Sequence, residues 1–192
     1  MSSVRAFLAI PLPDALHNAL ATLQDDLRKQ LHGVRWSHRE NLHLTLHFFA
    51  EVNQENLEKI KASMLSVKRC QRPFQVTVTG LGAFPSLRRA RVIWLGTQPQ
   101  EPLGQLYRKC RRALQAAGIE TDSRPYFPHV TIGRTRRQPV DLAALGARPG
   151  DAPIGGLPVT RMILYESRLT PEGAHHNPLF EVHFDEQADE TI

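Results

Sequence analysis

Apolar residues recur along the chain with two different periods, and the period predicts the element. Apolar residues at every second position are typical of a strand, whereas spacings of three and four are typical of an amphipathic helix. Strands are therefore predicted at residues 5–12, 42–49, 74–78, 91–95, 159–166 and 180–184, with a short extended segment at 34–36 and a further strand after Pro128.

Three helices are predicted between these strands, each with one apolar stripe. The first begins after Pro13 and ends before Gly33, the second is capped by Asn53, and the third begins at Pro102 and ends near Gly118. The residues expected to face the core are Leu16, Leu20, Leu23, Leu27 and Leu31 in the first helix, Leu57, Ile60, Met64 and Leu65 in the second, and Leu103, Leu106, Cys110 and Leu114 in the third.

Glycine and proline predict where elements end. Gly80 and Gly82 are expected to end the strand at 74–78. The stretch 135–158 is expected to be a long connection with one helical turn at 142–145, and 170–173 is expected to be a turn. The acidic tail after about residue 185 is expected to be frayed.

One short pattern occurs in both halves of the chain. His43-Leu44-Thr45-Leu46 is matched by His129-Val130-Thr131-Ile132, and each tetrapeptide alternates polar and apolar residues as a strand does. The alternation through residues 42–49 places Leu42, Leu44, Leu46 and Phe48 on one face and His43, Thr45 and His47 on the other. Each motif strand thus offers one imidazole and one hydroxyl, side by side.

The repeated motif and the similar placement of helices in each half predict the fold class. We expect an α+β fold in which residues 1–192 form a single domain of two pseudo-symmetric lobes. Each lobe has an antiparallel sheet with flanking helices, and a cleft lies between the lobes. If the two motif strands are neighbours, their histidines face each other across this cleft.

Paired histidines fit the hydrolysis of a phosphodiester. One imidazole removes a proton from the attacking water while the other, protonated at the start, donates a proton to the leaving oxygen. The two oxygens are roughly in line through phosphorus, so the two rings must flank the phosphate. Thr45 and Thr131 could bind the non-bridging oxygens, and Arg134 could add a charged donor.

Less specific interpretations of these residues stay open at this stage. A single H-x-T in a strand is commonly an ordinary polar pair, and both threonines could be plain strand formers. His43 and His47 could bind zinc if they lay on a helix, although the alternation favours a strand. His175 and His176 are expected to be solvated in a turn-like stretch. The aromatic residues Trp94, Tyr126 and Phe84 could stack on a nucleobase or be buried in the core.

Composition and charge narrow the class of protein. The chain is 41% hydrophobic and 22% charged, which is ordinary for a soluble globular protein, and its net charge of +5 favours an anionic partner such as RNA. The basic helix face formed by Arg108, Lys109, Arg111 and Arg112 could steer such a partner or be an ordinary solvated surface.

The two cysteines, Cys70 and Cys110, have no spacing that indicates a disulfide framework or a zinc site, so a cytoplasmic location is expected. The apolar run 7–10 is too short for a membrane span.

The chain resembles the two-histidine phosphoesterases, and within them the bacterial and archaeal RNA 2′,3′-cyclic phosphodiesterases, earlier described as 2′-5′ RNA ligases. The resemblance spans nearly the whole chain. It rests on the segments His43-Leu44-Thr45-Leu46, Pro128-His129-Val130-Thr131-Ile132 with Arg134 after it, Arg5-Ala6-Phe7-Leu8-Ala9-Ile10-Pro11 and Glu166-Ser167-Arg168-Leu169.

The resemblance implies a bilobal α+β fold that opens a terminal 2′,3′-cyclic phosphate of RNA to a 2′-phosphate without a metal or any other cofactor. It implies that His43 is the proton donor and His129 the proton acceptor. Some 2′-5′ RNA ligase activity is expected beside hydrolysis. We expect a cytoplasmic monomer whose partner is RNA rather than a membrane. The alternatives are a non-enzymatic module that binds RNA ends, and a metal hydrolase that uses His43 and His47.

Overall fold

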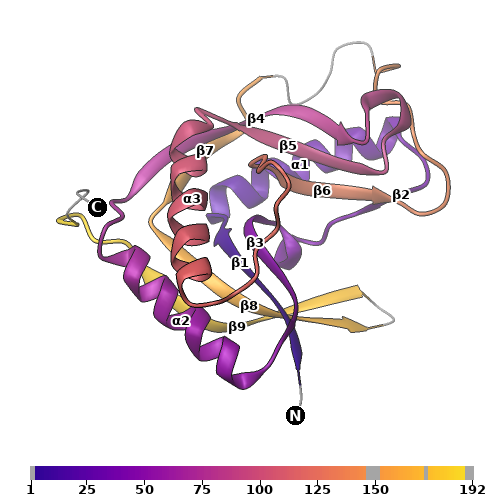
Figure 1. Ribbon diagram of the computed structural model, residues 1–192. Coiled ribbons are helices and arrows are strands. Elements are labelled where there is room, and N and C mark those ends of the chain that lie inside the picture. Colours follow the sequence, from indigo (N-terminus) through magenta and orange to yellow (C-terminus); the bar gives the residue numbers. More distant parts are fainter. Residues whose placement is uncertain (1–2, 146–151, 171–172, 189–192) are drawn as a thin grey trace.

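A computed structural model describes residues 3–145, 152–170 and 173–188 of the chain (Figure 1). Within these residues the strands are β1 (Val4–Pro11), β2 (Val34–Trp36), β3 (His43–Val52), β4 (Phe74–Phe84), β5 (Val92–Gln98), β6 (Val130–Thr135), β7 (Gly155–Val159), β8 (Arg161–Thr170) and β9 (Gly173–His183). The helices are α1 (Asp14–Gln30), α2 (Gln54–Lys68) and α3 (Glu101–Ala116), with 3₁₀ turns η1 (Arg39–Asn41) and η2 (Leu87–Arg89).

The three predicted helices are confirmed, and their apolar stripes are buried as expected with one exception. The side chain of Asn53 caps α2 by accepting a hydrogen bond from the backbone N–H of Asn56 at 2.8 Å. Leu65 was expected to face the core, but it is 44% exposed. It follows Met64 directly, so it lies about 100° around the helix from it and outside the stripe.

All nine described strands belong to one antiparallel sheet, in the order β7-β4-β5-β6-β3-β1-β8-β9 with β2 paired to β6. Helices α2 and α3 pack side by side, with α2 against β9 and α3 against β3, while α1 contacts β7 in the other half (Figure 1). The α+β class is confirmed.

The two halves of the sheet meet between β3 and β6, where the pairing is limited to Leu44 opposite Val130. The division into two lobes stays a prediction, and this narrow joint is where it would fall.

The pairings on either side of this joint correspond residue by residue. In one half Thr45 lies opposite Ala9 and His47 opposite Leu8, so that Leu46 is an extra residue on β3. In the other half Thr131 lies opposite Trp94 and Gly133 opposite Ile93, so that Ile132 is an extra residue on β6. Each motif strand thus carries a β-bulge immediately after its H-x-T, which supports the pseudo-symmetry predicted from the repeat.

The bulge in β3 overturns one prediction about its faces. One extra residue inverts the alternation beyond it, so His47 is buried and Phe48 is 48% exposed. Phe48 was expected beside the leucines and His47 beside His43. Phe49 takes the core position instead, at 5% exposure.

Several element boundaries also differ from expectation. Strand β4 continues through Gly80, whose φ of +76° accommodates an irregularity in the pairing instead of ending the strand. The expected connection at 135–158 contains β7, which pairs with β4. A helical turn was expected at residues 142–145, and the structure has a turn there, closed by a 3.2 Å hydrogen bond between the Leu145 N–H and the Leu142 carbonyl, that is not assigned as a helix.

The C-terminal part of the chain is more ordered than expected. The last strand extends over Gly173–His183 because it pairs with the whole of β8. The tail was expected to fray after about residue 185, but Ala188 is buried and its carbonyl accepts a 2.9 Å hydrogen bond from Nε of Arg72. Residues 171–172 of the expected turn and residues 189–192 of the tail lie outside the described residues. Among the described residues, no helix is both long and apolar enough to cross a membrane.

Candidate active site

A groove of about 670 Å³ lies over the joint between the two halves of the sheet. It is lined by Phe7, Arg35, Trp36, Ser37, His38, Asn41, His43, Thr45, Phe48, Phe84, Val92, Arg124, His129, Thr131, Arg134, Ser167, Gly173, Ala174 and His176. All five predicted site residues are among them, and they come from both motif strands. The structure therefore brings together the residues that the repeated motif singled out.

The two bulges decide which residues after the H-x-T motifs face the groove. Without a bulge, Gly133 would follow Thr131 on the groove face and Arg134 would lie on the opposite face. The extra residue in β6 reverses this and turns Arg134 into the groove. Phe48 is in the corresponding position on β3, where the Arg5 guanidinium lies over its ring, 5.3 Å from the centroid.

The hydrogen bonding of His129 fixes its tautomer. Nδ1 lies 2.7 Å from the backbone carbonyl of Phe127. A carbonyl can only accept, so Nδ1 carries the proton and Nε2 of the neutral ring is left as a proton acceptor. Burial lowers the pKa of His129. Phe84 contacts the ring edge-to-face, with centroids 5.2 Å apart.

His43 is held in a more enclosed environment. Its ring stacks on Phe7 with centroids 4.5 Å apart and planes at 24°. Burial is the main cause that lowers the pKa of His43 to about 3, and the charges of His176 and His129 act in the same direction. His43 and His129 line the same groove.

His176 is a third histidine in the groove, and the sequence did not predict it. It was expected to be solvated in a turn, but it lies on β9 opposite Ser167. Its ring meets His43 edge-to-face, with centroids 5.4 Å apart. Burial lowers the pKa of His176, and the neighbouring charge of His175 adds to the effect. The register of β8 with β9, which the sequence pattern did not reveal, brings it to the site.

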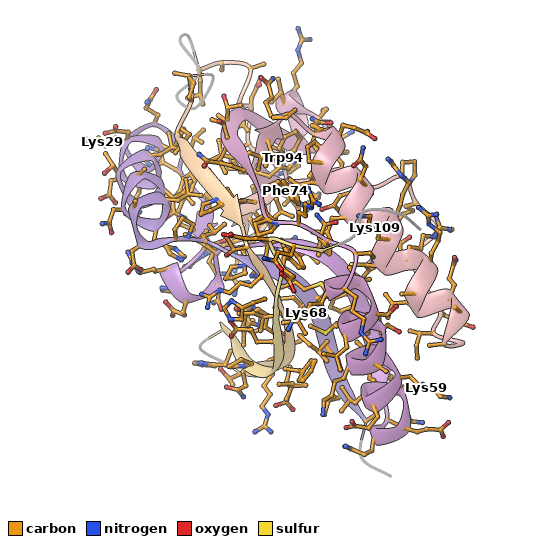
Figure 2. The ribbon with its side chains drawn as sticks, turned by 90° about the vertical axis from the view of Figure 1, so that its left-hand side faces the viewer. Lys29, Lys59, Lys68, Phe74, Trp94 and Lys109 are labelled. Carbon is orange, nitrogen blue, oxygen red and sulfur yellow. The ribbon has the colours of Figure 1, made fainter. Side chains whose placement is uncertain are left out.

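The groove is strongly biased toward positive charge. Among the described residues its lining contains the guanidinium groups of Arg35, Arg124 and Arg134 but no Asp, Glu or Lys. The lysines labelled in Figure 2, such as Lys29 and Lys109, lie on the helices instead. Arginine binds phosphate through two parallel N–H donors, so this lining suits a phosphate better than a carboxylate-rich site would.

The threonine hydroxyls are available for a ligand. Thr45 and Thr131 are half-buried in the groove wall, and within the described part of the chain neither hydroxyl forms a hydrogen bond. Their backbone carbonyls are held in place: that of Thr45 accepts from the Tyr126 hydroxyl at 3.3 Å, and that of Thr131 accepts from Oγ of Ser37 at 3.1 Å. The two hydroxyls can therefore donate to an anion between the histidines.

The zinc alternative for His43 and His47 is wrong because the bulge separates the two side chains. His47 packs away from the groove, stacked on Tyr107 with centroids 4.4 Å apart. Burial lowers the pKa of His47 to about 4. Over residues 3–145, 152–170 and 173–188, no three His, Cys, Asp or Glu side chains are grouped so that they could hold a metal ion.

The three aromatic residues considered for base stacking lie in different environments. Phe84 lines the groove and is 38% exposed. Tyr126 stacks on Tyr107 with centroids 4.1 Å apart, and Trp94 packs against Phe127 at 4.8 Å, so both belong to the scaffold around the site. Of these residues only Phe84 is placed to touch a ligand.

The basic face of α3, which could steer an anionic partner, forms contacts within the protein at two of its four residues. Arg108 forms a 2.7 Å ion pair with Glu101, and Nζ of Lys109 donates to the backbone carbonyl of Cys70 at 2.7 Å. None of the four basic residues of this face lines the groove.

Comparison with known proteins identifies the family of the chain. Residues 10–94 match the family described as LigT-like phosphoesterase. An RNA 2′,3′-cyclic phosphodiesterase of Methanothermobacter thermautotrophicus is 34% identical over an alignment that covers 88% of this chain and 93% of the relative. An RNA 2′,3′-cyclic phosphodiesterase of Thermotoga maritima is 31% identical over an alignment that covers 95% of this chain and 96% of the relative. The crystal structure of Escherichia coli LigT complexed with 3′-AMP is similar with a TM-score of 0.75 and 30% identity, covering 95% of this chain and 99% of LigT.

Proposed function

The chain belongs to the LigT-like phosphoesterases, and from that premise we propose that it is an RNA 2′,3′-cyclic phosphodiesterase that opens a terminal cyclic phosphate to a 2′-phosphomonoester. The observation that carries this proposal is that one H-x-T histidine from each half of the sheet lines a single cationic groove. Two imidazoles on either side of a phosphate satisfy the in-line requirement of phosphoryl transfer.

His129 is the proton acceptor in this proposal. With Nδ1–H donated to the Phe127 carbonyl, the unprotonated Nε2 can take a proton from water as the water oxygen bonds to phosphorus. The carbonyl also orients the ring and stabilises the imidazolium that forms, as a carboxylate does in other histidine bases.

His43 is the proton donor to the ribose O3′ as the P–O3′ bond breaks. In the free protein the pKa of His43 is lowered to about 3, mainly by burial, so the ring is neutral near pH 7. The substrate anion supplies the missing counter-charge and raises this pKa, because a nearby negative charge favours the imidazolium. Substrate binding and proton uptake by His43 are therefore coupled.

Thr45, Thr131 and Arg134 bind the reacting phosphate in this proposal. In the part of the chain that the structure describes, the hydroxyls of Thr45 and Thr131 have no hydrogen-bond partner, and in this proposal they donate hydrogen bonds to the non-bridging oxygens. Arg134 adds a charged donor. The charge of Arg134 contributes to the lowered pKa of both His43 and His129, and Arg134 lines the same groove as the two rings.

A ribose 5′-hydroxyl that attacks phosphorus in place of water, with the same cleavage of the P–O3′ bond, would give a 2′-5′ linkage, and the excess of water makes hydrolysis the main activity. We further propose that the protein acts on RNA ends as a monomer in the cytoplasm. Both cysteines, Cys70 and Cys110, are free thiols, which is consistent with a reducing compartment.

Product analysis tests the proposal. Incubation of the protein with adenosine 2′,3′-cyclic phosphate and a chelator should give adenosine 2′-phosphate, and replacement of either motif histidine by alanine should abolish most of this product. The alternative, a module that binds RNA ends without chemistry, predicts no product and salt-dependent binding that survives both replacements. Formation of the 3′-phosphate would contradict the assigned roles of His43 and His129.

A further inference from the structure

Arg35 and Arg134 lie directly opposite each other in the pairing of β2 with β6. Side chains opposite each other in an antiparallel pair point to the same face and lie close together, and like charges in this arrangement are destabilising. Burial lowers the pKa of Arg134, and the charge of Arg35 is the second cause. The sequence places two cations where the sheet by itself would favour a neutral or opposite-charge pair.

Over residues 3–145, 152–170 and 173–188, no carboxylate relieves this repulsion. Within the described part of the chain, neither Arg35 nor Arg134 forms an ion pair or a side-chain hydrogen bond, and the groove that both line contains no Asp or Glu. Two unpaired guanidinium groups that face one groove form a site for an anion with more than one pair of acceptor oxygens.

The backbone under this pair is held firmly. The side-chain amide of Gln24, buried on α1, donates to the Ser37 carbonyl at 3.0 Å and to the Ile132 carbonyl at 2.8 Å. The Ser37 N–H also donates to the Ile132 carbonyl, at 2.9 Å. These bonds fix β2 against β6, so Arg35 is presented to the groove by a rigid element.

The two arginines are not equivalent with respect to the histidines. Arg134 is on β6, the strand that continues from His129, whereas Arg35 is on β2, which pairs with β6 and lies outside the main strand order. Arg35 is thus one strand further from the reacting phosphate. Because Arg35 lies directly opposite Arg134 and both line the groove, the two guanidinium groups can bind one anion together.

We propose that Arg35, with Arg134, binds a second phosphate of the substrate, the internucleotide phosphodiester that joins the terminal nucleotide to the one before it. The protein would then be selective for the ends of RNA chains over nucleoside 2′,3′-cyclic monophosphates. This inference rests on the proposed function, since it assigns the substrate class of the same groove.

A matched pair of substrates isolates this contact. Adenosine 2′,3′-cyclic phosphate has only the reacting phosphate, whereas the dinucleotide ApA with a 2′,3′-cyclic end adds one phosphodiester. Arg35→Gln is expected to lower kcat/KM for the dinucleotide by about tenfold and to leave that for the mononucleotide within about twofold. Arg112→Gln, on the exposed face of α3 and outside the groove, removes the same charge and should alter neither value.

A stability measurement separates recognition from structure. Because Arg35→Gln relieves the repulsion with Arg134, its Tm should equal or exceed that of the parent protein, whereas a structural arginine would give a lower Tm. Equal losses on both substrates would assign Arg35 to the reacting phosphate and overturn the proposal. Unchanged kinetics on both substrates would overturn it as well.

The same variants distinguish failure of the inference from failure of the proposed function. If the parent protein hydrolysed neither substrate, the proposed function would fail. Binding of 3′-AMP and of ApA with a 3′-phosphate would then be compared directly. Tighter binding of the dinucleotide that is lost in Arg35→Gln would still support a second phosphate site, and equal binding of the two ligands would overturn it.

Discussion

The imidazole of His176 meets the ring of His43 edge-to-face, with centroids 5.4 Å apart, and both histidines line the same groove. After burial, the charge of His176 is the largest cause that lowers the pKa of His43. His176 therefore opposes protonation of His43, the ring to which we assign the acid role. A substitution at position 176 can remove this effect while His43 itself is kept.

Replacement of His176 by phenylalanine keeps the edge-to-face contact and removes the charge. We expect the pKa of His43 to rise in His176→Phe, because a neighbouring positive charge no longer disfavours the imidazolium. The titration of the His43 Cε1–H signal by NMR measures this shift, and it needs no substrate. A His43 pKa that stays unchanged or falls in the variant would show that His176 acts on His43 only by packing.

Replacement of the two motif histidines should reveal that they act as a unit. His43→Ala and His129→Ala should each reduce kcat by about 10² to 10⁴-fold, the usual contribution of a general acid or base. The double variant should lose less than the product of the two single effects, because each step needs both groups. Steady-state rates on adenosine 2′,3′-cyclic phosphate measure this. Strictly multiplicative losses would mean that the two rings act independently.

The sequence predicted the helices, the motif strands and the central pair of histidines because these depend on local period and on a repeat. It could not predict which residues flank the motifs in the groove. The segment Leu46-His47-Phe48-Phe49 is compatible with either phase of alternation, and only the pairing with β1 shows that a bulge inverts it. Arg134, a predicted phosphate ligand, likewise lines the groove because of the bulge in β6, which the sequence did not reveal.

His176 was missed for a related reason. Its neighbourhood, which contains Pro178, is typical of a turn by composition, yet it forms an edge strand whose register with β8 brings His176 beside His43. A register between distant strands is a tertiary property, and no periodicity within residues 173–180 indicates it.

The close contact of Gly82 with Trp94 predicts a coupled loss of stability and activity. A β-carbon at Gly82 would lie 2.1 Å from Cη2 of the Trp94 indole, which in turn packs on Phe127 and lies beside His129. Gly82→Ala should therefore destabilise the fold by about 1–3 kcal/mol and reduce kcat by displacing the wall behind His129. Urea unfolding and steady-state rates measure both effects.

Gly104→Ala is the matched control for this variant. Gly104 lies in α3, where a β-carbon would meet Nη1 of Arg108 at 3.4 Å, an ordinary contact with a flexible side chain. Alanine is favoured over glycine inside a helix, so this change should stabilise the fold by up to about 1 kcal/mol. Equal unfolding free energies for the Gly82 variant and the parent protein would show that Trp94 can move aside freely.

Phosphate binding is expected to take up protons. The ring of His43 is neutral in the free protein because its pKa is lowered to about 3, and an anion in the groove raises that pKa. Isothermal titration with 3′-AMP in two buffers of different ionisation enthalpy should show net proton uptake near pH 7, and the uptake should be smaller in His43→Ala. If the number of protons were the same in both proteins, His43 would not be the group that charges.

Acid sensitivity of the fold should depend on His47, which the proposed chemistry does not use. Burial lowers the pKa of His47 to about 4, against an ordinary value near 6.5. Between these values the unfolded chain binds a proton that the folded protein does not, so the free energy of unfolding falls as the pH falls from about 6.5 to 4. At pH 5 this histidine alone lowers the free energy of unfolding by up to about 2 kcal/mol.

His47→Leu removes the titration and keeps an apolar side chain against Tyr107. The loss of stability of this variant between pH 7 and pH 5 should therefore be smaller by about that amount. Urea unfolding of both proteins at the two pH values measures the difference. Parallel losses would show that His47 is protonated in the folded state as readily as in the unfolded chain.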